Sequence, residues 1–124
     1  MEKFVFKLLL NLILACFIVL ILPGNATAEM NAMEFLKKYD SATGTKKFIY
    51  LQYLNGTSNG LGWANSLLAK KYPKAVIYCP PKKLKVSATL DITILRQFVA
   101  KFPKFGTWPV GGAMLFALKN KWPC

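Results

Sequence analysis

The sequence predicts an all-α fold, a small bundle of about four helices closed by one disulfide. Apolar residues recur at helical spacing in segments that glycine and proline separate. The stretch 79–124 contains two such segments, joined by a proline-marked turn, with a cysteine at each end. Cys79 and Cys124 can be joined only if the second helix of this stretch doubles back on the first.

The last two helices have the clearest boundaries. Ser87 or Thr89 can cap the first, because a hydroxyl accepts a hydrogen bond from the free N–H groups of a first turn. Pro103 ends it, since the residue before a proline avoids the helical region, and Pro109 suits the first turn of the next helix. Small residues at 111–113 leave room for another helix. The two apolar stripes are Leu90, Ile94, Leu95, Phe98, Val99 and Phe102, then Val110, Ala113, Met114, Ala117, Leu118 and Trp122.

Two earlier helices are also predicted. Asn31 and Glu34 form the start of a capping box, which opens a short helix. Its apolar side consists of Met33, Leu36 and Tyr39, with Phe35 beside them. Residues 40–45 are predicted to form a turn, and a longer helical pattern then runs over 46–71. Its middle, 55–62, is open to helix or loop, because each glycine there costs about 1 kcal/mol against alanine in a helix.

Residues 1–28 are predicted to be a cleavable signal peptide. Two early lysines precede an apolar run at 8–22, and the small residues 26–28 offer a cleavage site. The alternative is an uncleaved anchor, because the apolar run is nearly long enough to span a bilayer. Acylation of Cys16 is disfavoured, since the run stays apolar after it. Cleavage would leave one helical domain, 29–124, in the periplasm.

Cleavage would change the charge balance. The whole chain has 17 basic and 5 acidic residues. Lys3, Lys7 and Glu2 would leave, so that 15 basic and 4 acidic residues remain and the net charge is +11. Every remaining basic residue except Arg96 is lysine, which is less suited than arginine to reading bases. An acidic protein, lipid headgroup or wall polymer is therefore expected as partner rather than nucleic acid. Simple solubility is the alternative.

Cysteine content agrees with export. Only Cys79 and Cys124 would remain after cleavage, and two cysteines in an oxidising compartment usually pair. Cross-linking a loop of this length contributes about 4 kcal/mol on the chain-entropy estimate. Two separate thiols, or a bridge between subunits, are the alternatives. The predicted helix turn favours a bridge within one chain.

The residue types argue against an enzyme. The chain has no histidine. It therefore lacks an imidazole that could act as a base, and it lacks the commonest metal-ligating side chain. Glu34 is expected as a cap, and Asp91 in a first helical turn where the dipole favours it. The serines have no predicted base partner, and Trp63, Trp108 and Trp122 are expected in the core. We therefore expect no catalytic residues, no cofactor and no metal.

The linker at 70–85 is the candidate binding segment. It is rich in lysine, proline and tyrosine, and its prolines lower the entropy lost on binding. Tyrosines are frequent interface anchors. The candidate partner-binding residues are Tyr72, Tyr78, Lys82, Lys83 and Lys85. The alternative is a solvated linker with Val76 and Ile77 in the core.

The stretch 79–124 resembles the Rap/Tai family of small immunity proteins, which protect bacteria from peptidoglycan amidases injected by type VI secretion. The residues that carry the resemblance are Cys79 and Pro81, Val86 and Ser87, Pro103, Pro109, and the terminal Trp122, Pro123 and Cys124. Their order and spacing fit the family's last two helices.

The resemblance extends more loosely over 30–68. Tyr53 and Gly56 match a tyrosine–x–x–glycine of the family's second helix, which favours helix over 55–62 with glycines placed for close packing. Tyr39 and Tyr50 stand where the family commonly has a second cysteine pair. This chain therefore departs from the family pattern by one whole bridge.

The resemblance implies a periplasmic immunity protein that binds and occludes a secreted amidase. Its partner would be the cognate peptidoglycan amidase effector, and the family also implies a homodimer. Membrane contact would be transient, through the signal peptide. The alternative function is a periplasmic binding or chaperone-like protein that acts on acidic envelope polymers or unfolded clients. A neighbouring gene for a secreted amidase would favour the first.

The export prediction can be tested directly. Because the small residues 26–28 follow the apolar run, the exported protein should begin at Glu29. N-terminal sequencing of protein from the periplasmic fraction measures this. Recovery of the full-length chain in the membrane fraction would contradict it.

Overall fold

The structure is a computed structural model that describes residue 1 and residues 29–84 and 87–124. The predicted signal peptide, from residue 2 onward, lies outside the described residues. So do Lys85 of the candidate binding set and Val86 of the family pattern. None of the helices in the described ranges combines the length and hydropathy of a membrane span.

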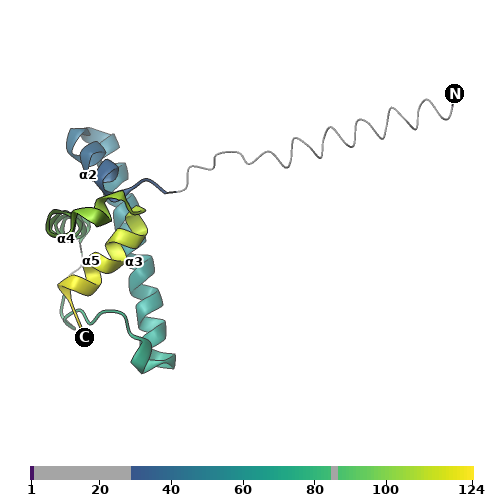
Figure 1. Cartoon of the computed structure of the whole chain (residues 1–124), viewed down its shortest axis with the longest axis vertical. Helices are drawn as coiled ribbons and strands as arrows, with labels where there is room; N and C mark the ends of the chain where they lie inside the picture. The colour runs from purple at the N-terminus through teal and green to yellow at the C-terminus, as the bar shows by residue number, and fades with distance from the viewer. Residues whose placement is uncertain (2–28, 85–86) are drawn as a thin grey trace.

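Four α-helices make up the described part, and no strand occurs there. They are α2 (Ala32–Ser41), α3 (Gly44–Lys71), α4 (Ala88–Lys101) and α5 (Val110–Lys121), with 3₁₀ turns η1 (Pro73–Ala75) and η2 (Pro103–Thr107). The predicted all-α bundle is confirmed. The long α3 runs the length of the domain, and the other three helices pack against it (Figure 1).

The helix ends follow the expected chemistry. The Asn31 side chain accepts a hydrogen bond from the Glu34 N–H at 2.8 Å, and the Ser87 hydroxyl accepts one from the Leu90 N–H at 3.2 Å. Ser87 is therefore the cap of α4, rather than Thr89. The predicted turn at 40–45 is too long, because α2 continues through Ser41 and α3 begins at Gly44.

Helix α3 is continuous through 55–62, which settles the choice between helix and loop. Its core face carries Leu54, Ser58 and Asn65, all buried. The expectation that its glycines serve close helix packing is wrong. In the described ranges, nothing beyond the backbone of α3 itself and the adjacent residues lies within 4 Å of a Cβ added at Gly56 or Gly60. Burial of the opposite face stabilises the helix and outweighs the low helix propensity of the glycines.

The core lies between α4 and α5, with one face each of α2 and α3 added. The stripes predicted for α4 and α5 are confirmed, with Leu90, Phe102 and Trp122 partly buried and Ile92 added to the core. On α2 the buried residues are Ala32, Phe35 and Leu36, whereas Met33 is 52% exposed. The prediction therefore misjudged how α2 is rotated, because Ala32 and Phe35 face the core in place of Met33.

The segment before α2 is tied to the start of α5. The Ala32 N–H donates to the Trp108 carbonyl at 2.9 Å, and the Val110 N–H donates to the Met30 carbonyl at 3.0 Å. The Glu29 carboxylate accepts from the Gly111 N–H at 2.6 Å. It occupies the space next to Gly111, where an added Cβ would lie 2.9 Å from Glu29 Oε1. The lack of a side chain at Gly111 therefore leaves space for the Glu29 carboxylate. A helix was expected to pack against this position, and the carboxylate lies there instead.

Cys79 and Cys124 form a disulfide within one chain, as predicted, with their Cα atoms 5.0 Å apart. The Cys79 N–H also donates to the Trp122 carbonyl at 2.9 Å. The bridge joins the linker to the end of α5. It closes a loop with a sequence separation of 45 residues that contains α4, η2 and α5.

Loss of this bridge should destabilise the domain. In the Cys79→Ser, Cys124→Ser variant the unfolded chain regains the freedom of the closed loop, so the free energy of unfolding should fall by about 2–4 kcal/mol. Urea titration measures the change. Reducing agent should lower the wild-type midpoint and leave the variant unchanged; equal midpoints for all samples would contradict the prediction.

Candidate functional site

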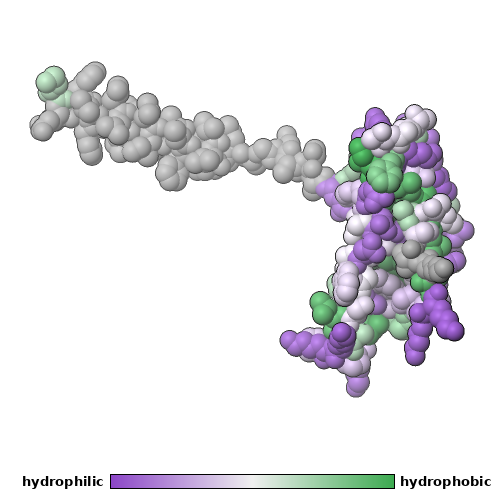
Figure 2. All heavy atoms as spheres, turned by 180° about the vertical axis from the view of Figure 1, so that it is seen from behind, coloured by the Kyte–Doolittle hydropathy of each residue, from purple (hydrophilic) through white to green (hydrophobic). Residues whose placement is uncertain are grey.

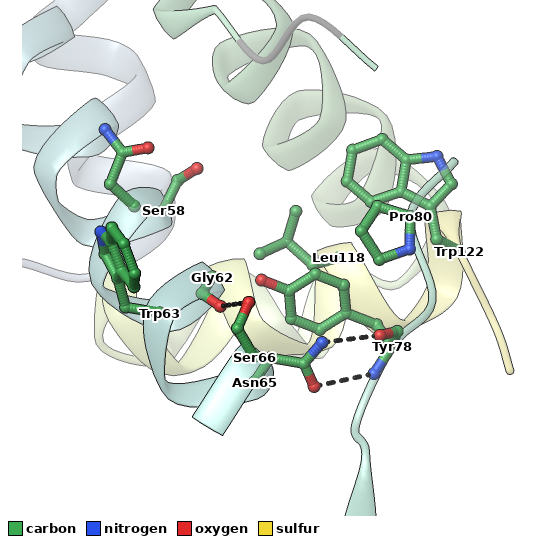
Figure 3. A pocket seen from close by; sticks show the side chains of 10 residues that line it. Ser58, Gly62, Trp63, Asn65, Ser66, Tyr78, Pro80, Leu118 and Trp122 are labelled. Atoms are coloured by element: carbon green, nitrogen blue, oxygen red, sulfur yellow. Dashed lines mark hydrogen bonds between the residues drawn. The ribbon is translucent and has the colours of Figure 1, made fainter. Parts of the chain in front are cut away.

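The linker is held against α3 by one buried side chain, Asn65. Its amide nitrogen donates to the Tyr78 carbonyl at 2.7 Å (Figure 3), and its oxygen accepts from the Ile77 N–H at 2.8 Å. Asn65 thereby pairs with the backbone of the linker as a neighbouring strand would. Because buried backbone groups require partners, this amide fixes an extended segment that has no regular structure of its own.

Adjacent linker residues point to opposite sides of this extended segment. Tyr78 lies on one side, where its ring is 4% exposed and packs 6.4 Å from the Trp122 ring. Ile77 lies on the other side, partly buried against the core. The linker thus separates two hollows on the surface of the domain.

The first hollow is a pocket of about 280 Å³ between α3, the linker and α5. Tyr78 crosses it, with Trp63 on one side and Pro80 and Trp122 on the other (Figure 3). The remaining lining comes from Ser58, Asn59, Gly62, Asn65, Ser66 and Leu118. Hydroxyl and amide groups therefore stand beside aromatic faces, an arrangement that suits a neutral polar ligand with an apolar side.

The second hollow, of about 630 Å³, lies on the Ile77 side and is more apolar. Its lining consists of Val76, Ile77, Phe98, Phe102, Phe105, Phe116, Asn120, Pro123 and Cys124, with Lys104 and Lys119 contributing the charges. Its aromatic rings form one connected cluster in which Phe98 and Phe105 are 4.9 Å apart. This surface suits an apolar side chain of a partner, with lysines beside it for an acidic neighbour.

Asp91 lies near Ser58 and Tyr78 of the first pocket, in the first turn of α4 as expected, but it is fully buried. Neither carboxylate oxygen has a hydrogen-bond partner among the described residues. Burial raises the pKa of Asp91 to about 6; the nearby Ser58 hydroxyl lowers it, although its geometry falls short of a hydrogen bond. Burial, and then the Asp91 charge, also raise the pKa of Tyr78.

Exposed lysines occur at the end of α3 and again further along the linker. Lys70, Lys71, Lys74, Lys82 and Lys83 are all exposed. Tyr72 is exposed among them, with the Lys71 ammonium 5.5 Å from its ring centre. Hydrophilic side chains project from this end of the domain, away from α2 (Figure 2). We call the exposed residues Tyr72, Lys70, Lys71, Lys74, Lys82 and Lys83 the basic end.

The candidate binding residues divide into three groups. Tyr72, Lys82 and Lys83 are exposed at the basic end, and Lys85 lies outside the described residues. Tyr78 is buried and lines the first pocket, so its side chain does not project from the linker; its contact with a partner stays a prediction. Its backbone is bonded to Asn65, which brings the ring inward.

Sequence reasoning missed one residue of the site, Asn65, and wrongly placed two tryptophans in the core. Asn65 was not considered, although a polar residue between Leu61 and Leu68 on the core side of a helix was a usable signal. Trp63 was expected in the core and is instead 75% exposed. Trp108 is also exposed, and only Trp122 of the three tryptophans packs against the core.

The chemistry available at the site is recognition by shape, charge and hydrogen bonding. Within the described ranges no group of three metal-ligating side chains converges. The Ser66 hydroxyl donates to the Gly62 carbonyl at 2.9 Å.

Comparison of the chain with protein-family models, characterised proteins and solved structures finds no match.

The buried acid gives a testable pH dependence. The pKa of Asp91 is about 6 in the fold and 3.8 without it, so the fold favours the neutral form. The stability contributed by Asp91 is present below about pH 4 and is lost as pH rises through 6. Asp91→Asn should remove this loss and raise the free energy of unfolding above pH 7 by up to about 3 kcal/mol.

The measurement is urea unfolding of both proteins between pH 4 and pH 8. The gain from Asp91→Asn should be small at pH 4 and largest above pH 7. Asp40→Asn is the control, because Arg96 lowers the pKa of that exposed carboxyl and its contribution is lost as pH falls. A gain from Asp91→Asn that is equal at every pH would contradict the assignment.

Proposed function

We propose that the chain is an exported immunity protein that binds and occludes a secreted peptidoglycan amidase in the periplasm, and that it is not an enzyme. The observation that carries the proposal is the basic end. Its lysines stand beside a linker that Asn65 and the disulfide hold in one conformation. Occlusion requires a fixed complementary surface, and a preorganised segment loses little entropy on binding.

The residues of the Rap/Tai resemblance support this proposal through their structural roles. Ser87 caps α4, Pro103 follows its end, and Cys124 is bonded to Cys79. These are the positions that set the angle between the last two helices and attach the linker to them. A cognate amidase with an acidic surface would suit the charge of the basic end.

The alternative is a periplasmic protein that binds envelope polymers, and the first pocket favours it. Trp63 and Trp122 present aromatic faces, and Asn59 and Ser58 lie beside them. Such lining suits the apolar faces and hydroxyl groups of a sugar. A client-binding role would instead use the second hollow, whose lining is mainly aromatic and aliphatic.

Direct binding tests the immunity proposal. In a panel of periplasmic amidases, at least one should bind residues 29–124, and cells that produce the protein should resist lysis by that amidase. Lys82→Glu with Lys83→Glu should mainly slow association, because opposite charges accelerate encounter, and added salt should weaken the same step. Tyr72→Ala should mainly speed dissociation, since anchors act on the lifetime of a complex.

Lys37→Glu is the matched control for charge. Lys37 is exposed on α2, away from the basic end, so its reversal should change association less than Lys82→Glu does. Circular dichroism should be the same for all variants. Failure to bind or protect against every amidase would favour the envelope-binding alternative. Protection that survives every linker variant would place the contact elsewhere, with 40–45 as the next candidate.

A further inference from the structure

The second hollow extends along α5, from the 3₁₀ turn η2 to the linker. Phe116, Lys119 and Asn120 line it from α5, and residues three and four apart share one face of a helix. At one end the Phe105 ring of η2 packs 5.3 Å from the Phe116 ring. At the other end the linker, with Ile77 in the lining, lies beside the end of α5 (Figure 1). The hollow therefore follows the axis of α5.

The walls of the hollow are apolar and already packed against one another. The Phe98 ring centre lies 5.1 Å from that of Phe102 and 4.9 Å from that of Phe105. Phe98 is buried and forms the floor, whereas Phe116 is exposed at the rim. Because neighbouring rings hold each wall, the hollow is preformed, as ligand pockets usually are. Its volume of about 630 Å³ also lies within the range of such pockets.

Positive charge borders this apolar surface. Lys104 and Lys119 are exposed members of the lining, and the described lining contains no acidic side chain. The Lys104 ammonium lies 5.2 Å from the centre of the Phe105 ring, which places it at the edge of the aromatic cluster. Within the described ranges neither lysine forms an ion pair. Both ammonium groups are therefore available to an anionic group of a ligand.

Hydrogen-bonding groups are scarce in the hollow. A peptide backbone carries an N–H and a C=O at nearly every residue, and these groups need partners when they are buried. Lysine can only donate, and Asn120 is the one described side chain of the lining that both donates and accepts. The Ile77 N–H of the linker is already bonded to Asn65. A hydrocarbon chain needs no such partners, so it fits this lining better than a peptide segment does.

We propose that the second hollow binds a free single-chain amphiphile with an anionic head, such as a fatty acid. The alkyl chain lies along α5 against the phenylalanine rings, and the anionic head lies beside the Lys104 and Lys119 ammonium groups. This ligand belongs to a different class from the amidase and from envelope polymers. The site uses none of the residues of the basic end, so this proposal and the amidase proposal can fail independently.

A series of alkyl chain lengths tests whether a chain enters the hollow. The probes are straight-chain carboxylates from hexanoate to dodecanoate, each below its micelle concentration. Isothermal titration calorimetry with residues 29–124, which contain every described helix and the disulfide, measures their affinity. Each CH₂ group that becomes fully buried should lower the dissociation constant about fourfold. The gain should stop once the hollow is full. Affinity that does not change with chain length would overturn the proposal.

The head group is tested with the chain held constant. Decanoate should bind more tightly than decyltrimethylammonium, because the lysines attract the first head and repel the second. Lys104→Gln and Lys119→Gln should each weaken decanoate binding by roughly twofold to fivefold, as expected for exposed ion pairs. Lys37→Gln, which removes an exposed charge on α2, is the matched control and should leave the affinity unchanged. Equal binding of the two heads, or equal effects of all three substitutions, would contradict the placement of the head.

A carboxylate placed in the hollow tests the position of the chain. Phe116→Asp should abolish decanoate binding, because it puts a negative charge on the apolar wall. Leu67→Asp is the matched control, since Leu67 is an equally apolar, exposed residue within a helix and lines neither hollow. Circular dichroism should show both variants folded, and the lysine variants decide the matter if Phe116→Asp is not. A folded Phe116→Asp protein that binds decanoate normally would overturn the proposal. So would binding that appears only above the micelle concentration, because the protein would then recognise an aggregate surface.

Discussion

The side chain on which the rest of this domain depends is the buried amide of Asn65. The linker must pass from the end of α3 to the start of α4, and its backbone polar groups need partners where it crosses the core. Asn65 supplies a donor and an acceptor to successive linker residues. Tyr78 is thereby directed inward and Cys79 is brought to the end of α5, where the disulfide forms. The pocket, the second hollow and the position of the basic end all follow from that path.

Much of the fold was predictable because α4 and α5 each have one apolar stripe between proline boundaries. The proline-marked turn also returns the second helix along the first, so the disulfide followed from the same pattern. Helix α3 was harder, because it is apolar on two faces and its periodicity alone does not tell which face is buried. Trp63 was assigned to the core for that reason, and it lies on the exposed face.

The candidate site was less predictable than the fold. The exposure of Tyr72, Lys82 and Lys83 could be predicted from composition, since exposure is the usual state of a charged linker. The inward direction of Tyr78 depends on a hydrogen bond to a residue 13 positions earlier in the chain. Nothing in the local sequence of the linker encodes that contact. Asp91 was placed correctly in its helical turn, but its burial depends on how α3 packs over α4.

The carboxylate of Glu29 has a consequence for how the N-terminus of the domain has to be made. It caps the start of α5 and accepts from Tyr53 of α3, so the residue just after the predicted cleavage point is part of the folded structure. If the predicted cleavage takes place, a cut one residue later, after Glu29, would remove this carboxylate and leave the Gly111 N–H without its acceptor. The position of such a cut would then affect the stability of α5, and an affinity tag placed ahead of residue 29 is compatible with the fold only if that side chain is retained.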